Sequence, residues 1–312
     1  LTQMMTDAYQ TESNLILARR GKTFFWARFC LNQIQAREAT RLYRFCRYID
    51  DIGDDSVDAK QAKKDLSHII ESLRSGTSQN PIVRDAINLF KQYQIEVAIP
   101  ILLIEGVISD LDEVAIKDIE SLLIYCYQVA GTVGIMMCKI LGVMNQAAYA
   151  HAIDLGVAMQ LTNICRDVKE DALLVRHYLP KTLLGNLSLN TLMQPDMQSQ
   201  MIITNALKTL LALADQYYAS AAKGFCFLPL RARFAIALAA KLYQQIGVVL
   251  RNNDYQYWQQ RAYVSTPNKV LLSLGCIASH LINPLFYRYQ YHHSAILHQS
   301  LRLLPYANTR EI

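Results

Sequence analysis

Apolar residues recur at helical spacing along almost the whole chain, and few residues that break helices interrupt them. Only 12 Gly and 8 Pro occur among the 312 residues, between long runs of Ala, Leu, Ile and Gln. Apolar positions that return every three to four residues are typical of helices with one buried face. The pattern predicts helices over residues 6–19, from Phe24, over 36–54, 57–74, 81–94, 98–110, 117–142, 146–173, 198–222 and 230–252, and from Pro267 to the end.

The stretches between these helices carry ordinary start and stop signals. Pro81 stands in the first turn of its helix, where its missing backbone N–H costs nothing. Pro180 closes the helix before it, because the residue that precedes a proline disfavours helical angles. Residues 181–196 form the most loop-like stretch and have room for a single helical turn. No repeat, linker or change of composition appears, so we expect an all-α protein with one domain over residues 1–312.

Two predicted helices carry a row of polar side chains along one face of an otherwise apolar helix. The first row consists of Tyr43, Arg47, Asp50 and Asp54, at i, i+4, i+7 and i+11. The second row consists of Gln160, Asn163, Asp167 and Asp171, at i, i+3, i+7 and i+11. At about 100° per residue, each row stays within roughly 60° of the helix circumference. Buried carboxylates are costly unless they meet cations. Two such rows facing across a cavity would bind divalent ions and, through them, diphosphate.

A solvated helix end is the simpler explanation for the acidic cluster at residues 50–55 taken alone. The second row weakens that explanation, because both rows have the spacing D-x-x-x-D and an arginine shortly before the first aspartate. Arg47 and Arg166 have two compatible roles: they neutralise the neighbouring aspartates, or they bind phosphate through the planar guanidinium fork.

Gly131 and Gly134 interrupt another apolar helix. Each glycine costs about 1 kcal/mol relative to alanine in a helix interior. Two explanations remain open. The glycines permit close packing of helices, or they mark a local break that leaves volume beside a ligand.

Composition and charge exclude several classes of function. The net charge of +5, without a dense basic block, argues against nucleic acid as a partner. Seven cysteines without a CxxC pair indicate a reducing, cytoplasmic location. The seven histidines show no local metal-binding spacing, which argues against a zinc site. The chain also contains no dinucleotide-binding fingerprint, so we expect no tightly bound nicotinamide. No apolar stretch reaches the roughly 18–20 residues of a membrane span, although peripheral contact with the inner face of a membrane is compatible with the chain.

The motifs together resemble those of the squalene/phytoene synthase family, the head-to-head prenyl transferases. The matching segments are Lys22-Thr23-Phe24, the first row, Tyr125–Gly134, the second row, Tyr178-Leu179-Pro180, Tyr243–Ile246 and Arg261–Ser265. They run from about residue 22 to 270 in the family's order. The resemblance implies the class I isoprenoid synthase fold, a single helical bundle around a central cavity.

The resemblance also implies roles for individual residues, with Mg²⁺ as the cofactor and Mn²⁺ as the alternative ion. The implied metal ligands are Asp50, Asp54, Asn163, Asp167 and Asp171, and the four aspartates with Arg47 and Arg166 form the implied catalytic set. The implied diphosphate contacts are Tyr43, Arg47, Arg166, Tyr243, Arg261 and Lys269, with Gln160 near the reacting carbons. Phe24, Tyr127 and Val133 would line the prenyl tunnels, although a place in the ordinary helical core explains the aromatic positions equally well.

The chain departs from the family pattern at two places. The usual Arg-Gly-Arg before Tyr-Leu-Pro is replaced by Leu174-Val175-Arg176-His177, so one basic residue and the glycine are missing. Arg28 stands where relatives often carry an apolar residue.

The function that the resemblance implies is the joining of two geranylgeranyl diphosphates to phytoene, through the cyclopropyl compound prephytoene diphosphate, with release of diphosphate. The stretch from Arg261 to Lys269 favours this carotenoid-type reaction. One alternative is a C30 enzyme that joins two farnesyl diphosphates to dehydrosqualene, presqualene diphosphate or squalene. Another is a non-catalytic assembly factor, which the intact rows argue against. A head-to-tail synthase would carry D-D-x-x-D in both rows, and the second row lacks it.

Overall fold

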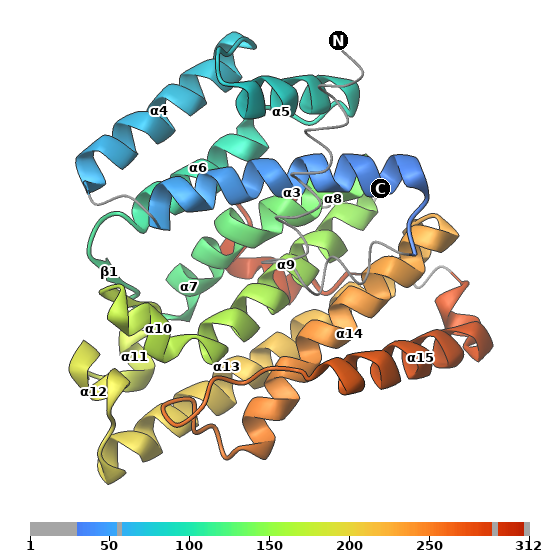
Figure 1. Ribbon diagram of the computed structural model, residues 1–312. Coiled ribbons are helices and arrows are strands. Elements are labelled where there is room, and N and C mark those ends of the chain that lie inside the picture. The colour runs from blue at the N-terminus through green and yellow to red at the C-terminus, as the bar shows by residue number, and fades with distance from the viewer. Residues whose placement is uncertain (1–29, 55–57, 289–292, 309–312) are drawn as a thin grey trace.

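The computed structural model describes residues 30–54, 58–288 and 293–308, and most of them lie in helices (Figure 1). The all-α prediction is therefore confirmed. The longer helices are α3 (Gln33–Asp54), α4 (Ala59–Ser75), α5 (Pro81–Gln92), α6 (Ala98–Ser109), α7 (Ile119–Cys126), α8 (Thr132–Ile140), α9 (Ala147–Arg166), α13 (Met197–Lys223), α14 (Leu230–Asn252) and α15 (Thr266–Ile282). The shorter ones are α10 (Val168–Leu173), α11 (Lys181–Leu184), α12 (Leu189–Met193) and the 3₁₀ turns η2 (Gly224–Phe227), η3 (Pro284–Phe286) and η4 (Ala295–Leu301).

Most predicted helix ends lie within a few residues of the observed ones. The predicted helix over 230–252 coincides with α14, and the one over 198–222 differs from α13 by one residue at each end. Local signals account for this agreement. The Asn80 side chain accepts hydrogen bonds from two backbone N–H groups at the start of α5, and Gly76 ends α4 in the left-handed conformation.

Three predicted helices were wrong in part. The helix expected over 146–173 is interrupted at Asp167, and the helix expected over 117–142 contains a π-helical turn. The last predicted helix ends at Ile282 instead of continuing to the end of the chain. The stretch expected to be loop-like contains two short helices, α11 and α12. The helices predicted over 6–19 and from Phe24 lie outside the described residues.

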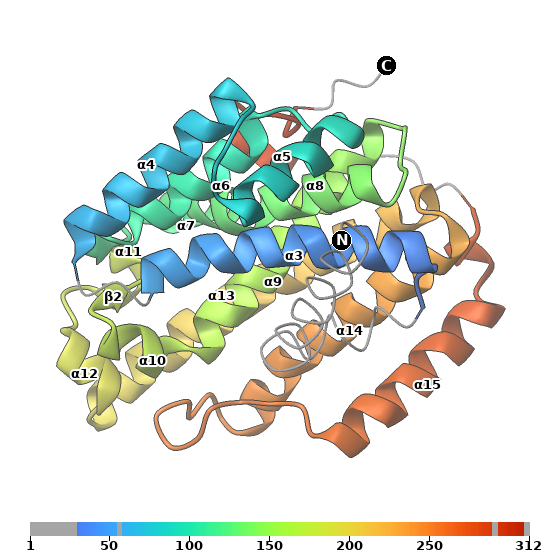
Figure 2. The same ribbon diagram turned by 45° about the horizontal axis from the view of Figure 1, so that its top comes forward.

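Helix α9 lies at the centre of the bundle, where it packs against α13, α8 and α14 (Figures 1 and 2). Ile153, Val157 and Leu161 on this helix are fully buried. Helix α3 packs on α5 and α8, while α15 packs on α14 at the outer edge. Nearly all buried apolar side chains of the described residues belong to one contiguous cluster. The two helices that carry the polar rows, α3 and α9, are therefore both core elements.

A two-stranded parallel sheet ties the segment after α10 to the connection between α6 and α7. Strand β1 (Val114–Ala115) pairs with β2 (Arg176–His177), and Val114 is the partner of Arg176. The residue before β2, Val175, has φ 61°, a left-handed conformation that is unusual for a β-branched residue. The sheet thereby fixes the backbone position of Arg176.

The glycines at the contact between α8 and α9 serve close helix packing. A Cβ atom added to Gly134 would lie 2.3 Å from the carbonyl oxygen of Ala152, and one added to Gly156 would lie 2.4 Å from the carbonyl oxygen of Ala130. The local break is also present, because residues Tyr127–Gly131 form the π-helical turn η1 between α7 and α8. Close packing therefore accounts for Gly134, and Gly131 lies in a local break of the helix.

We predict that Gly156→Ala destabilises the protein by about 1–3 kcal/mol, because backbone atoms of the facing helix cannot move aside for the new methyl group. Urea or thermal denaturation followed by circular dichroism measures this. Gly275→Ala on α15 is the matched control. Its new Cβ meets no atom of the described chain within 4 Å, so it should stabilise the helix by about 0.5–1 kcal/mol. Equal stability of Gly156→Ala and the wild type would contradict the close contact.

Candidate active site

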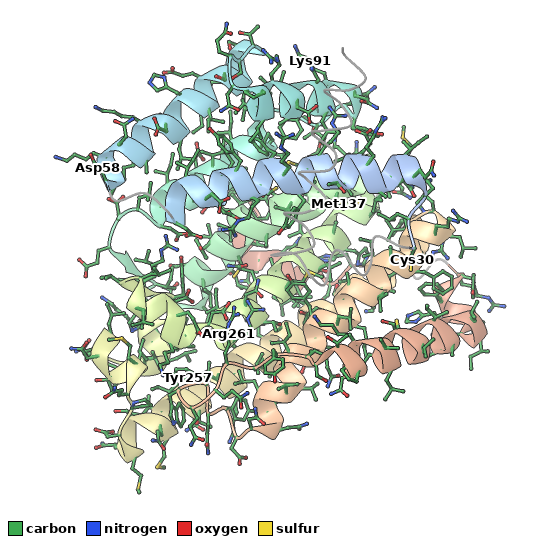
Figure 3. All side chains as sticks on the ribbon, viewed as in Figure 1. Cys30, Asp58, Lys91, Met137, Tyr257 and Arg261 are labelled. Atoms are coloured by element: carbon green, nitrogen blue, oxygen red, sulfur yellow. The ribbon has the colours of Figure 1, made fainter. Side chains whose placement is uncertain are left out.

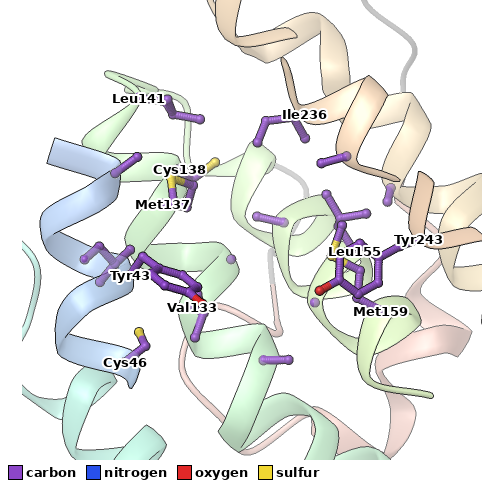
Figure 4. A pocket seen from close by; sticks show the side chains of 18 of the residues that line it. Tyr43, Cys46, Val133, Met137, Cys138, Leu141, Leu155, Met159, Ile236 and Tyr243 are labelled. Carbon is purple, nitrogen blue, oxygen red and sulfur yellow. The ribbon is translucent and has the colours of Figure 1, made fainter. Parts of the chain in front are cut away.

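A largely apolar cavity of about 320 Å³ lies between α3, α8, α9 and α14 (Figure 4). Tyr43 of α3 and Tyr243 of α14 approach it from opposite sides. Its charged and amide lining residues are Asp50 from the first row and Gln160 and Asn163 from the second row. The two rows, more than a hundred residues apart in the sequence, therefore border the same cavity.

The apolar part of the cavity extends along the two central helices. The lining of α9 reaches from Asn163 back to Ala148, a distance of about 22 Å at 1.5 Å per residue. Val133, for which a tunnel role is predicted, belongs to the lining together with Met137 and Met159. A long apolar space with polar groups toward the carboxyl ends of α3 and α9 fits a ligand with a hydrocarbon tail and a polar head.

The first row lies on the carboxyl-terminal half of α3. Burial raises the pKa of Asp50 to about 7; the guanidinium of Arg47 acts in the opposite direction, and the carboxylates of Asp54 and Asp51 raise it further. Arg47 donates from Nε to Asp51, at 2.8 Å, so its strongest partner is not a member of the row. The carboxylates of this row are thus only partly neutralised.

The second row crosses the junction between α9 and α10 without losing its alignment. Asp167 departs from helical geometry, with φ −105° and ψ 17°. Its backbone N–H still donates to the Asn163 carbonyl and its carbonyl accepts from Asp171 N–H, both at 2.8 Å. Burial, followed by the charge of Asp167, raises the pKa of Asp171 to about 8. The interruption therefore leaves the row intact.

The side-chain oxygen of Asn163 lacks a hydrogen-bond donor among the described residues. Asn163 donates from its amide nitrogen to the side-chain oxygen of Gln160 at 3.3 Å. Its own side-chain oxygen is buried and has no hydrogen-bond partner within the described part of the chain. A buried acceptor without a partner costs about 1–3 kcal/mol, so the site gains from a ligand that supplies positive charge here.

Sequence reasoning missed two residues that connect the rows, Asp110 and Arg176. Arg176 donates to Asp54 of the first row at 2.8 Å, and its charge also lowers the pKa of Asp171 in the second row. Asp110, at the end of α6, accepts a 2.8 Å hydrogen bond from the Tyr125 hydroxyl, and burial raises its pKa to about 6.

No local motif marked either of these residues. Asp110 looks like an ordinary helix end in the sequence, and Arg176 stood out only as part of a departure from the family pattern. Their place beside the rows follows from the small parallel sheet and from the end of α6, which are tertiary features.

Asp167 is held by two arginines from distant parts of the chain. The Nε atom of Arg166 donates to it at 2.7 Å, and the Nε atom of Arg261 donates at 2.8 Å. Arg261 lies in the segment between α14 and α15 (Figure 3). Arginines that already converge on the second row are placed to bind an anionic ligand that enters the cavity.

Five predicted substrate contacts among the described residues do not belong to the cavity lining: Arg47, Arg166, Arg261, Tyr127 and Lys269. Tyr127 was expected to line it, but this side chain is fully buried elsewhere and its hydroxyl donates to the Pro305 carbonyl at 2.8 Å. Lys269 lies in the first turn of α15 and does not belong to the lining described here. Phe24 lies outside the described residues. Tyr127 thus does not line this cavity, because spacing along a buried helix does not fix the direction of one side chain, and its tunnel role stays a prediction.

The donor atoms along the two rows match hard divalent ions. They are carboxylate oxygens and one amide oxygen, the ligands that Mg²⁺ and Mn²⁺ prefer. The buried amide oxygen of Asn163 and the raised pKa values of Asp50 and Asp171 are consistent with a site that needs added positive charge.

Comparison with known proteins places this geometry in context. Residues 17–268 match the family model described as squalene/phytoene synthase. A 15-cis-phytoene synthase of Pantoea ananas is 33% identical over 83% of this chain and 88% of its own length. One of Enterobacter agglomerans is 34% identical over 81% and 89%.

Solved structures agree on the fold. A dehydrosqualene synthase crystallised in complex with a ligand is 26% identical, with a TM-score of 0.79 over 88% of this chain and 98% of that one. A squalene synthase from Alicyclobacillus acidocaldarius, 18% identical, gives a TM-score of 0.68 over 80% and 96%, which supports the fold alone.

We predict that Asn163→Leu leaves the free energy of unfolding unchanged or raises it by about 1 kcal/mol, because it removes an unsatisfied buried acceptor. The same variant should lose affinity for Mn²⁺, measured by electron paramagnetic resonance. Asn80→Leu is the contrasting control. Its side chain caps α5, so its loss should destabilise the protein by about 1 kcal/mol and leave Mn²⁺ binding unchanged. Undiminished Mn²⁺ binding by Asn163→Leu would contradict a ligand role for Asn163.

Proposed function

The chain belongs to the squalene/phytoene synthase family, and we propose that it joins two geranylgeranyl diphosphates head to head to form phytoene. The observation that carries this proposal is the shared cavity. Polar groups of both rows border one long apolar space, as a substrate with a diphosphate head and a prenyl tail requires. The enzyme is a prenyl transferase, and the reaction passes through prephytoene diphosphate with release of diphosphate.

We assign the metal ligands to the oxygen atoms of the two rows. They are Asp50, Asp54, Asn163, Asp167 and Asp171. A divalent ion bound there, Mg²⁺ or Mn²⁺, supplies Lewis-acid assistance to the departing diphosphate. Family membership supports a divalent-metal requirement, and the all-oxygen donor set supports the choice of ion.

The arginines and tyrosines of the site bind and orient the diphosphate groups. Arg166 and Arg261 already meet at Asp167, and Arg47 meets Asp51, so each exchanges a carboxylate partner for phosphate when substrate binds. Tyr43 and Tyr243 face the cavity from either side, and a tyrosine hydroxyl can donate to a phosphate oxygen. Lys269 stays a predicted diphosphate contact.

The cavity wall keeps water away from the reacting carbons. The cationic intermediate of a prenyl transfer reacts with any water that reaches it, so a dry cavity protects the product. Met137, Leu155 and Met159 supply apolar surface, and Gln160, which also lines the cavity, is the polar side chain that we assign to the neighbourhood of the reacting carbons. The walls also hold both prenyl chains in a reactive orientation.

The C30 alternative receives less support than the C40 reaction. The phytoene synthases named above are 33–34% identical to this chain, whereas the dehydrosqualene synthase is 26% identical. The apolar lining of about 22 Å along α9 also favours a long prenyl tail. A non-catalytic role is disfavoured because every aspartate of both rows is present.

We also propose a single domain over residues 1–312 and a cytoplasmic location with peripheral membrane contact. The one main apolar cluster of the described residues supports the former. Exposed Leu271, Leu274 and Ile282 on α15 support the latter. Contrary to the expectation from the sequence, Ile119–Ile140 and Leu230–Asn252 are apolar and long enough to span a bilayer. However, 56% and 50% of their apolar 18-residue windows are buried, as in core helices.

The direct test supplies the purified protein with geranylgeranyl diphosphate or farnesyl diphosphate and Mg²⁺, and identifies the hydrocarbon by mass spectrometry. We expect a C40 product from the former and little or no C30 product from the latter. Chelation by EDTA should abolish turnover, and added Mg²⁺ or Mn²⁺ should restore it. A C30 product alone would contradict the phytoene assignment.

We predict that Asp50→Ala and Asp167→Ala each lower turnover by about 100-fold or more, because each removes a metal ligand. Both variants should retain the helical circular dichroism spectrum, because each change alters charge interactions of side chains and leaves the helix backbone and the apolar core in place. Asp112→Ala, a change at an exposed carboxylate paired with Lys63, should keep full activity. Wild-type turnover in both row variants would exclude the proposed metal roles.

A further inference from the structure

A buried cluster of one aspartate and two histidines lies on α9, away from the polar rows. Asp154 precedes Asn163 by nine residues on the same helix, about 13 Å along its axis. His293 and His298 come from the C-terminal segment, residues 293–308. Each oxygen of the Asp154 carboxylate lies 2.8 Å from the Nε2 atom of one histidine. Asp154 is fully buried, and the His298 side chain is 2% exposed.

The hydrogen bonds of His298 define which of its ring nitrogens carries a proton. Its Nδ1 atom lies 2.8 Å from the Ala307 carbonyl oxygen, which can only accept, so Nδ1 bears the hydrogen. In a neutral ring, Nε2 then has a lone pair that faces an oxygen of Asp154 at 2.8 Å. Two acceptors at this distance repel each other. The contact therefore requires a cation shared between them, either a second proton on the ring or a metal ion.

The Asp154 carboxylate presents one oxygen to each histidine, at 2.8 Å from Nε2 in both cases. This carboxylate and the two imidazole nitrogens converge in a buried place and offer three ligand atoms, all within 4.8 Å of one another.

We propose that Asp154, His293 and His298 bind a transition-metal ion of the Zn²⁺ class, with water as the fourth ligand. Ligand atoms in a tetrahedral zinc site lie about 3.3 Å apart, so the two contacts of 2.8 Å need to open only slightly. The bond from His298 to the Ala307 carbonyl is the outer contact that orients a metal-bound histidine. Two imidazoles favour Zn²⁺ over Mg²⁺, which prefers oxygen ligands.

This site was not expected from the sequence, where the absence of a local histidine spacing argued against zinc. The two histidines are five residues apart, and the aspartate precedes them by 139 and 144 residues. Only the return of the C-terminal segment to α9 brings the three side chains together. Motif reading detects ligands that are close in sequence, so it fails for a site assembled in this way.

The bound ion would fasten the C-terminal segment to the central helix. The same segment accepts hydrogen bonds from Tyr217 at the Leu297 carbonyl and from Tyr127 at the Pro305 carbonyl. The ring of His293 packs at 5.3 Å on His151, which lines the apolar cavity. The ion thus supports one wall of the cavity and has a structural role that is separate from the oxygen-lined rows.

The test uses the full chain, stripped of metal and kept in excess Mg²⁺ so that the rows are saturated. Titration with Co²⁺ should give the intense visible absorption of a four-coordinate ion with one equivalent bound. Zn²⁺ should displace Co²⁺ and raise the Tm by about 5 °C when the free ion exceeds its Kd a hundredfold. The wild-type chain alone decides the question: no such band and no Tm rise would mean that a proton is the shared cation, and would overturn the proposal.

Matched variants locate the ion. His293→Gln and His298→Gln should lose the Co²⁺ band and the Zn²⁺-dependent rise in Tm, with folding checked by circular dichroism. His68→Gln removes an exposed histidine on α4 and should behave as the wild type. Asp50→Asn should keep the Co²⁺ band, because it alters only the oxygen-lined rows. An unchanged band in folded His293→Gln and His298→Gln would place the ion elsewhere and refute the assignment.

Discussion

The structure depends on the burial of several carboxylates between apolar helices, where the described residues supply too few cations to neutralise them. Arg47, Arg166, Arg176 and Arg261 reach the acidic region, yet burial keeps the pKa values of Asp50 and Asp171 far above the ordinary range. The apolar surroundings that penalise these charges also form the hydrocarbon cavity. The same apolar surroundings therefore exclude water from the cavity and create the need for added cations beside the buried carboxylates.

Helix α9 connects the parts of this arrangement. Its carboxyl-terminal half supplies Gln160 and Asn163 to the cavity, and its glycine face allows the closest approach of α8. Its amino-terminal half holds the C-terminal segment through Asp154. A shift of this helix along its axis would move the polar rows, the cavity wall and the C-terminal contacts together. The tight backbone contacts at Gly134 and Gly156 oppose such a shift.

The sequence predicted the helices and the family well, because helices follow from local periodicity and the family is identified by short sequence motifs. It also identified the two rows, since each lies on one helix. The link between them was not visible: Arg176 and Asp110 reach the rows through the small sheet and the end of α6. The direction of a single buried side chain was equally inaccessible, as Tyr127 shows. The cluster around Asp154 requires chain segments more than a hundred residues apart.

Val175 holds the turn before β2 in a strained backbone conformation. A β-branched residue held at φ 61° stores of order 1–3 kcal/mol of conformational strain, which glycine would avoid. The ion pair from Arg176 to Asp54 and the pairing with Val114 oppose its release. The strained conformation of this turn is therefore maintained by a contact with the acidic region, the ion pair between Arg176 and Asp54. A change of charge in the site that separates Arg176 from Asp54 removes this contact. The backbone conformation of the turn is therefore coupled to the charge of the site.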